Sequence, residues 1–257
     1  MKYPGKRLPL VAANWKMNTL PGGAGALVEE YGDEMLCGNP ELVVCPPFTH
    51  LAALGLTLGA AGCLGAQNCS EHLSGAFTSE ISAAMLRDLG CRYVILGHSE
   101  CRLRNPMESL RIPEKIAQAL AHGLTPIYCC GEDLPIRQSG AELDFIARQL
   151  ADDLPPELKL NSHKLVIAYE PVWAIGTGKH ASPEMAQQMH VFIRSRLKDM
   201  MGIEAERTRI LYGGSVQADN AAGFASQTDI DGVLVGGASL KPADFRAIFG
   251  AFAAKGQ

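Results

Sequence analysis

Three side chains suited to proton-transfer chemistry each stand just after a short apolar run: Glu170, His98 and Lys16. A carboxylate, an imidazole and an ammonium gathered at one place can remove a proton from a carbon beside a carbonyl and stabilise the enediolate that forms. Each also has an ordinary interpretation: Glu170 as an ion-pair or helix-capping acid, His98 as a structural histidine and Lys16 as a solvated charge. The combination favours catalysis.

Two glycine pairs, Gly213-Gly214 before Ser215 and Gly236-Gly237, follow the last two apolar runs. Either pair alone could serve only a tight turn. Two pairs, each before a helical segment, favour an anion site built from backbone N–H groups. No GxGxxG follows an apolar run, Gly178-Lys179 lacks the upstream glycine of a P-loop, and the sequence after Ser215 does not form a nucleophile elbow.

The segment 171–179, PVWAIGTGK, has the composition of a lid that excludes water from a reaction. Proline, valine and tryptophan stiffen one end, Gly176 and Gly178 loosen the other, and Ala174-Ile175 forms an apolar tip. An ordinary loop is the alternative.

The elements that must position these residues are strands covered on both faces, because the apolar runs are continuous rather than alternating. Helical spacing fills the intervals, so we predict an α/β fold: a single (β/α)8 barrel over 1–257, with about 32 residues per unit. A doubly wound open sheet is the fallback. The predicted strands are 10–13, 42–45, 63–66, 93–96, 126–129, 165–169, 210–212 and 232–235.

Local signals place several helix ends. Ser139-x-x-Glu142 matches a capping box, and Ser182-Pro183 matches an N-cap followed by proline at the first helical position. Glycines 38, 90 and 123 stand where a left-handed residue would close a helix. In the predicted barrel, the loops after the carboxyl ends of the strands form one rim, where Glu170, His98 and Lys16 would meet.

The composition excludes several classes of protein. With 47% hydrophobic and 19% charged residues the chain can bury a large core, and a net charge of −4 makes nucleic acid an unexpected partner.

The eight cysteines contain no CxxC pair, so we expect reduced core thiols. The sequence offers no metal-ligand cluster and no HExxH. The stretch 42–70 lacks charged residues but is broken by prolines and glycines, and no secretory segment precedes it, so a soluble, cytoplasmic protein is expected.

Together these segments resemble the triosephosphate isomerase family. The resemblance rests on NWKMN at 14–18, GHSE at 97–100, AYEPVWAIGTGK at 168–179, YGGSV at 212–216 and LVGGASL at 234–240, in the family's order. It implies the interconversion of dihydroxyacetone phosphate and D-glyceraldehyde 3-phosphate, a small phosphorylated triose, without a cofactor or a metal.

The resemblance also implies a role for each residue. Glu170 would be the base, His98 a neutral imidazole that polarises the carbonyl, and Lys16 the cation that binds the substrate. Ser99 and Glu100 would support them, Glu100 by positioning Lys16. The implied substrate-binding residues are Asn14, Lys16, Gly176, Ser215, Gly236 and Gly237.

The segment 67–82 resembles the projecting loop by which family members dimerise, and Thr78 would reach toward the partner's site; a long surface loop is the alternative. The chain departs from the family nearby. Cys101 replaces an arginine, and Met107 replaces a glutamate, with Glu108 one step later. We expect unchanged chemistry and a differently packed loop at 101–109.

Two other functions stay open. A Schiff-base barrel aldolase would need a lysine inside the sixth strand, whereas Lys164 stands at its start and Lys179 beyond the lid. A phosphate-binding barrel without catalysis is the second alternative, although each residue that the chemistry requires is present.

Overall fold

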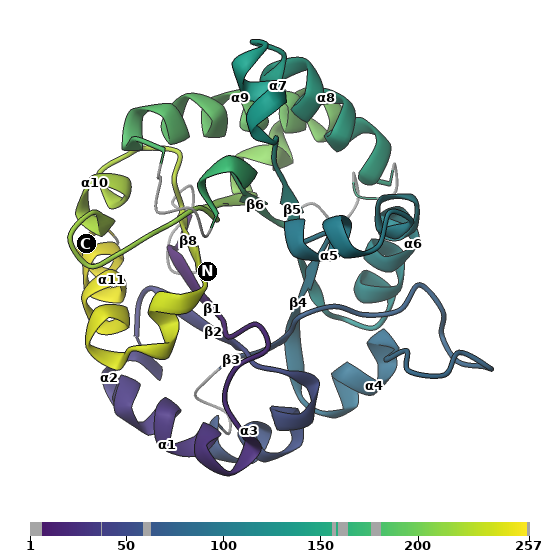
Figure 1. Cartoon of the computed structure of the whole chain (residues 1–257), viewed down its shortest axis with the longest axis vertical. Coiled ribbons are helices and arrows are strands. Elements are labelled where there is room, and N and C mark those ends of the chain that lie inside the picture. Colours follow the sequence, from purple (N-terminus) through teal and green to yellow (C-terminus); the bar gives the residue numbers. More distant parts are fainter. Residues whose placement is uncertain are drawn as a thin grey trace.

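Eight parallel strands close into a barrel in their sequence order within the part of the chain that the structure, a computed structural model, describes: residues 7–36, 38–58, 63–155, 158, 164–175 and 181–255. Figure 1 shows the strands around a central axis, with helices outside them. This is the predicted α/β barrel. The strands are β1 (Leu10–Asn14), β2 (Glu41–Cys45), β3 (Cys63–Ala66), β4 (Cys91–Leu96), β5 (Thr125–Cys130), β6 (Val166–Tyr169), β7 (Arg209–Tyr212) and β8 (Gly232–Val235).

The helices form the outer layer, with short 3-10 turns between some of them (Figure 1). The α-helices are α1 (Pro21–Tyr31), α2 (Asp33–Leu36), α3 (Leu51–Leu58), α4 (Ala83–Asp88), α5 (Ser99–Arg104), α6 (Glu108–Ala121), α7 (Leu134–Gln138), α8 (Glu142–Asp153), α9 (Pro183–Met201), α10 (Ala221–Ala225) and α11 (Pro242–Lys255). The 3-10 turns are η1 (Phe48–His50), η4 (Val172–Ala174), η5 (Gly202–Arg207) and η6 (Gly237–Leu240). No helix of the described residues is long and apolar enough to span a membrane.

The strands are continuously apolar because both of their faces are buried. Leu10 and Ala12 belong to a cluster made of strand residues inside the barrel, whereas Val11 and Ala13 pack in the layer between strands and helices. Successive strand side chains point to opposite faces, so each face needs an apolar side chain. The seven described cysteines are free thiols, and all of them except Cys101 are buried.

The helix-end predictions were partly right. Ser182 caps α9 by accepting a hydrogen bond from Met185 N, and Gly90 and Gly123 have φ values of 86° and 73°. Gly38 does not adopt a left-handed φ. The capping box at Ser139 was wrong: the Ser139 hydroxyl donates to Ile136 O, 2.8 Å away at the end of α7, and α8 begins after Ala141 without a side-chain cap.

A network of hydrogen bonds joins three strands at the amino end of the barrel. Arg209 at the start of β7 contacts Glu41 of β2 at 2.6 Å, and Tyr93 of β4 donates to the same carboxylate at 2.8 Å. Burial opposes ionisation of Glu41, but the charge and hydrogen bonds of Arg209 outweigh it and hold the pKa of this carboxyl below its usual value. These paired polar groups lie at the rim opposite the candidate site.

Candidate active site

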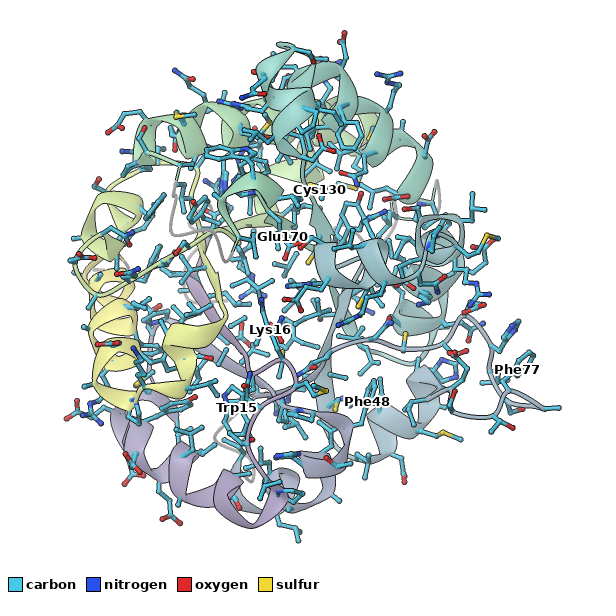
Figure 2. All side chains as sticks on the ribbon, viewed as in Figure 1. Trp15, Lys16, Phe48, Phe77, Cys130 and Glu170 are labelled. Atoms are coloured by element: carbon cyan, nitrogen blue, oxygen red, sulfur yellow. The ribbon has the colours of Figure 1, made fainter. Side chains whose placement is uncertain are left out.

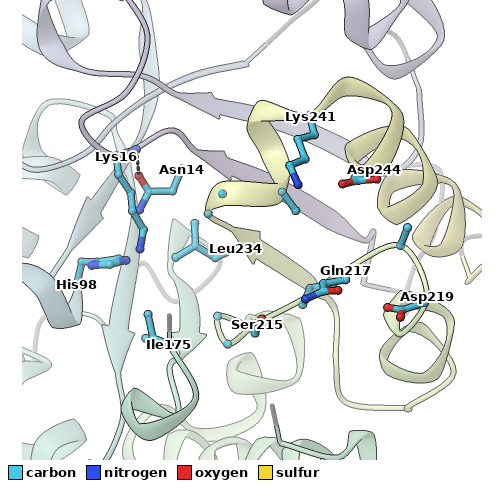
Figure 3. A pocket seen from close by; sticks show the side chains of 17 residues that line it. Asn14, Lys16, His98, Ile175, Ser215, Gln217, Asp219, Leu234, Lys241 and Asp244 are labelled. Carbon is cyan, nitrogen blue, oxygen red and sulfur yellow. Dashed lines mark hydrogen bonds between the residues drawn. The ribbon is translucent and has the colours of Figure 1, made fainter. Parts of the chain in front are cut away.

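A cavity of about 450 Å³ opens at the carboxyl ends of the strands (Figure 3). The predicted residues that line it come from β1, the β4–α5 junction and the loops after β7 and β8. They are Asn14, Lys16, His98, Ser215, Gly236 and Gly237. Barrel closure therefore brings together residues more than two hundred positions apart. Gly176 lies outside the described residues.

Lys16 is held in an uncommon backbone conformation. Its φ of 52° is left-handed, a region that few non-glycine residues adopt. Its N–H donates to Asn14 Oδ1 at 3.0 Å, and the Gln67 amide donates to its carbonyl oxygen at 2.8 Å. The Lys16 ammonium donates to Glu100 Oε1 at 2.7 Å. Although partial burial opposes ionisation of Glu100, the Lys16 contact lowers the pKa of that carboxyl, and the pair fixes the cation at the cavity.

His98 stands at the positive end of α5. Its Nδ1 accepts a hydrogen bond from Glu100 N at 3.2 Å, so Nδ1 carries no proton and the proton of the neutral ring lies on Nε2. His98 can therefore donate a hydrogen bond from Nε2 to an oxygen atom in the cavity.

Glu170 lies next to His98 and is only 1% exposed. Its Oε2 accepts from Ser99 N at 2.8 Å, and its Oε1 lies 3.1 Å from His98 Nε2 without the alignment of a hydrogen bond. Figure 2 shows Glu170 and Lys16 toward the centre of the barrel. The cavity wall does not include Glu170. Its carboxylate must rotate away from the Ser99 amide to reach a ligand in the cavity.

Two glycines make room for Glu170. A Cβ on Gly131 would lie 1.6 Å from the Glu170 carbonyl oxygen, and one on Gly213 would lie 2.9 Å from Glu170 Cγ. The sequence places Gly213 in a predicted anion-binding turn, and the structure adds this close approach to Glu170. Gly131 was missed, because only the packing of β5 against β6 makes a side chain impossible there.

The start of the predicted lid and the chain two residues beyond it are both held by hydrogen bonds. At the start, the Trp173 indole N–H and the Tyr169 hydroxyl donate to Glu132 Oε1 at 3.0 and 2.9 Å. Beyond the predicted lid, which ends at residue 179, Ala181 N donates to the Tyr212 hydroxyl at 3.3 Å. Residues 176–180 lie outside the described part, so the lid itself stays a prediction.

Sequence reasoning missed Glu132, which is fully buried. Burial raises the pKa of its carboxyl, although hydrogen bonds from Trp173 and Tyr169 oppose that effect. Glu132 follows β5 as Glu170 follows β6, so a search of every strand end for buried acids would have found it.

The charged residues that follow the two altered positions, Arg102 after Cys101 and Glu108 after Met107, both have ion-pair partners. Arg102 contacts Asp153 at 2.6 Å, and Glu108 forms an ion pair with Lys115 at 2.8 Å in which both side chains are buried. Cys101 is half-buried within α5, and burial raises the pKa of its thiol. Glu108 thus has a buried cationic partner even though the glutamate stands one residue later than in the family.

The segment 67–82 extends away from the barrel between β3 and α4 (Figure 1). Phe77 lies on it, as Figure 2 shows, and its ring stacks on that of His72 at 3.7 Å between centroids. Thr78 is exposed.

The described sixth strand contains no lysine, which removes the position that a Schiff-base aldolase would need.

Comparison with known proteins gives the same family by sequence and by structure. The family model described as triosephosphate isomerase matches residues 9–252. Curated proteins named triosephosphate isomerase include that of Shewanella denitrificans, 44% identical over 94% of this chain and 96% of its own length, and that of Shewanella amazonensis, 45% identical over 93% and 95%. The crystal structure of triosephosphate isomerase from Bartonella henselae superposes with a TM-score of 0.85 at 35% identity, covering 95% of this chain and 98% of that one.

Proposed function

The chain belongs to the triosephosphate isomerase family and interconverts dihydroxyacetone phosphate and D-glyceraldehyde 3-phosphate, and on that premise we propose that Glu170, His98 and Lys16 carry the reaction. The observation that supports this assignment best is the 3.1 Å separation between Glu170 Oε1 and His98 Nε2, at the rim where Lys16 also lies. A base and a proton donor so close together can act on neighbouring carbon and oxygen atoms of one small substrate.

The phosphate of the substrate binds the backbone N–H groups of Ser215, Gly236 and Gly237. These residues line the cavity. A Cβ on Gly236 would lie 3.7 Å from Lys16 Nζ, so the ammonium lies beside the Gly236-Gly237 turn. Main-chain donors together with one fixed cation suit a phosphate dianion. The family resemblance adds Gly176, which lies outside the described residues, as a further N–H donor in this proposal.

Proton transfer then proceeds between two carbons. Glu170 leaves the Ser99 amide, rotates into the cavity, takes the proton from C1 of dihydroxyacetone phosphate and returns it to C2. His98 donates from Nε2 to the carbonyl oxygen and moves protons between the two oxygens, and Lys16 and Asn14 stabilise the negative charge. Triosephosphate isomerases are a known case of a neutral imidazole beside a helix N-terminus, so this property belongs to the family.

A coupled assay with glyceraldehyde 3-phosphate tests the assignment of Glu170. Glu170→Asp withdraws the carboxylate by one methylene, and we expect kcat to fall on the order of 10²-fold because catalysis depends on position. Glu184→Asp makes the same chemical change at an exposed site on α9 and should leave kcat unchanged. Full activity of Glu170→Asp would show that another group is the base.

A chain that binds glyceraldehyde 3-phosphate but does not isomerise it above the rate in free solution would instead be a phosphate-binding barrel. The same coupled assay, run beside a binding measurement on the purified protein, separates that alternative from the enzyme.

We further propose that the protein is a homodimer joined through the 67–82 loop, with Thr78 directed toward the partner's site. Leu73 and Phe77 on this loop are 54% and 41% exposed, which leaves apolar area for a partner to cover. Light scattering after size exclusion tests this: a particle of 27.5 kDa, the mass of one chain, would contradict it. A cytoplasmic location, where glycolysis proceeds, is proposed with it, because free cysteines suit a reducing compartment.

A further inference from the structure

The cavity continues past the catalytic residues to a charged outer end. Figure 3 shows Lys16 and His98 at one end, and Lys241, Asp219 and Asp244 at the other. All five line the same cavity of about 450 Å³. The proposed reaction uses only the inner end, so the three outer charges have no role in it so far.

Lys241 stands where the phosphate-binding turn leads into α11. It directly follows η6 (Gly237–Leu240), and its carbonyl oxygen accepts the hydrogen bond of Phe245 N at 2.9 Å. Its side chain is exposed and forms no hydrogen bond or ion pair with any of the described residues. Lys16, in contrast, is paired with Glu100. Lys241 is therefore an ammonium free to attract an anion at the cavity mouth.

Two carboxylates share this opening. Asp219 belongs to the exposed connection between β7 and α10, and Asp244 to the first turn of α11. Within the described chain, neither of them forms an ion pair with Lys241. The mouth thus carries one positive and two negative side chains.

Charges in this position matter most when capture of the substrate limits the rate. Triosephosphate isomerases are a standard example of a rate close to the diffusion limit, and that property comes with the family. The substrate is a dianion and the chain has a net charge of −4, so the overall field opposes the encounter. A cation at the mouth makes the local field less repulsive to the dianion where the substrate enters.

We propose that Lys241, at the mouth of the cavity, attracts the phosphate dianion of the substrate before the main-chain amides bind it. Asp219 and Asp244 repel the dianion and so weaken this attraction. The inference rests on the proposed function. It predicts that the outer charges change the rate of substrate capture and leave the chemical step alone, since none of them reaches the reacting carbons.

The test measures kcat and kcat/KM for glyceraldehyde 3-phosphate at ionic strengths of about 0.01 M and 0.15 M. A unit charge about 10 Å from a dianion changes its encounter rate about three-fold at the lower ionic strength and about 1.5-fold at the higher one. Lys241→Gln should therefore lower kcat/KM by these factors with kcat unchanged, and Asp244→Asn and Asp219→Asn should raise it.

Two controls separate capture from structure. Lys198→Gln removes the same charge from the last turn of α9, far from the cavity mouth, and should leave kcat/KM unchanged at both ionic strengths. Glyceraldehyde, which lacks the phosphate, should react with Lys241→Gln as fast as with the wild type, because a steering charge acts only on the dianion.

The proposal is overturned if kcat/KM of Lys241→Gln equals that of the wild type at about 0.01 M ionic strength. It is also overturned if the loss is the same at both ionic strengths, or if it extends to glyceraldehyde. A wild-type protein without isomerase activity would instead overturn the proposed function, so the two failures are distinguishable.

Discussion

Replacement of Gly213 by alanine should displace Glu170 without unfolding the barrel. The new Cβ would lie 2.9 Å from Glu170 Cγ and 3.2 Å from Tyr169 O. Carbon atoms in contact prefer at least about 3.5 Å, so the shortfall is about 0.6 Å. Tyr169 O cannot easily yield, because it accepts the hydrogen bond of Gly213 N at 2.8 Å between β6 and β7. The Glu170 side chain must therefore absorb the shift.

The expected loss follows from the positional demand of the reaction. A misplacement of 1 Å can cost about 10²-fold, so a shift of about 0.6 Å should lower kcat roughly ten-fold. Extra volume in a packed site should also lower the free energy of unfolding by about 1–3 kcal/mol. KM should change little, because the phosphate-binding N–H groups remain.

Steady-state kinetics in the coupled assay, together with urea unfolding, check this prediction. Gly250→Ala is the matched control: a Cβ at this exposed position in α11 meets nothing within 4 Å. It should leave kcat unchanged and raise the free energy of unfolding by about 0.5–1 kcal/mol, since alanine favours helix. If Gly213→Ala keeps kcat within two-fold of the wild type, the placement of Glu170 against Gly213 is incorrect.

Two further predictions concern stability. Lys115→Met leaves Glu108 charged and buried without its partner, so it should lower the free energy of unfolding, measured in urea, by about 3–5 kcal/mol. Arg196→Ala removes an exposed ion pair and should lower it by less than about 1 kcal/mol. Equal losses for the two variants would contradict the burial of the Lys115–Glu108 pair. Burial lowers the pKa of His190 to about 3. Between that pH and about 6.5 the unfolded chain therefore binds one more proton than the folded chain. The free energy of unfolding should fall by up to about 1.4 kcal/mol per pH unit as the pH drops through this range. His190→Asn keeps an amide donor for Asp229 O and should flatten this slope in urea titrations at pH 7, 6 and 5; an unchanged slope would assign the proton uptake to other groups.

The strands could be predicted from the sequence because burial on both faces requires a continuous run of apolar residues. Gly232–Val235 and Cys63–Ala66 match the predicted strands at both ends, and the other strands differ from prediction by one or two residues at one end or at both. Signals from single residues were weaker. Ser139 fits a capping box in sequence, but its hydroxyl closes α7 instead, since the same polar group can serve the end of one helix or the start of the next.

The residue types of the site could also be identified from the sequence: an acid, an imidazole, an ammonium and two glycine pairs, each after an apolar run. Their arrangement was not, because it depends on distances across the barrel that no local pattern encodes. Only closure of the barrel brings the Glu170 carboxylate, just after β6, against the backbone N–H of Ser99 at the start of α5. It also leaves this carboxylate outside the cavity wall. Packing of neighbouring strands likewise decides that Gly131 tolerates no side chain and that Glu132 holds the first turn of the lid.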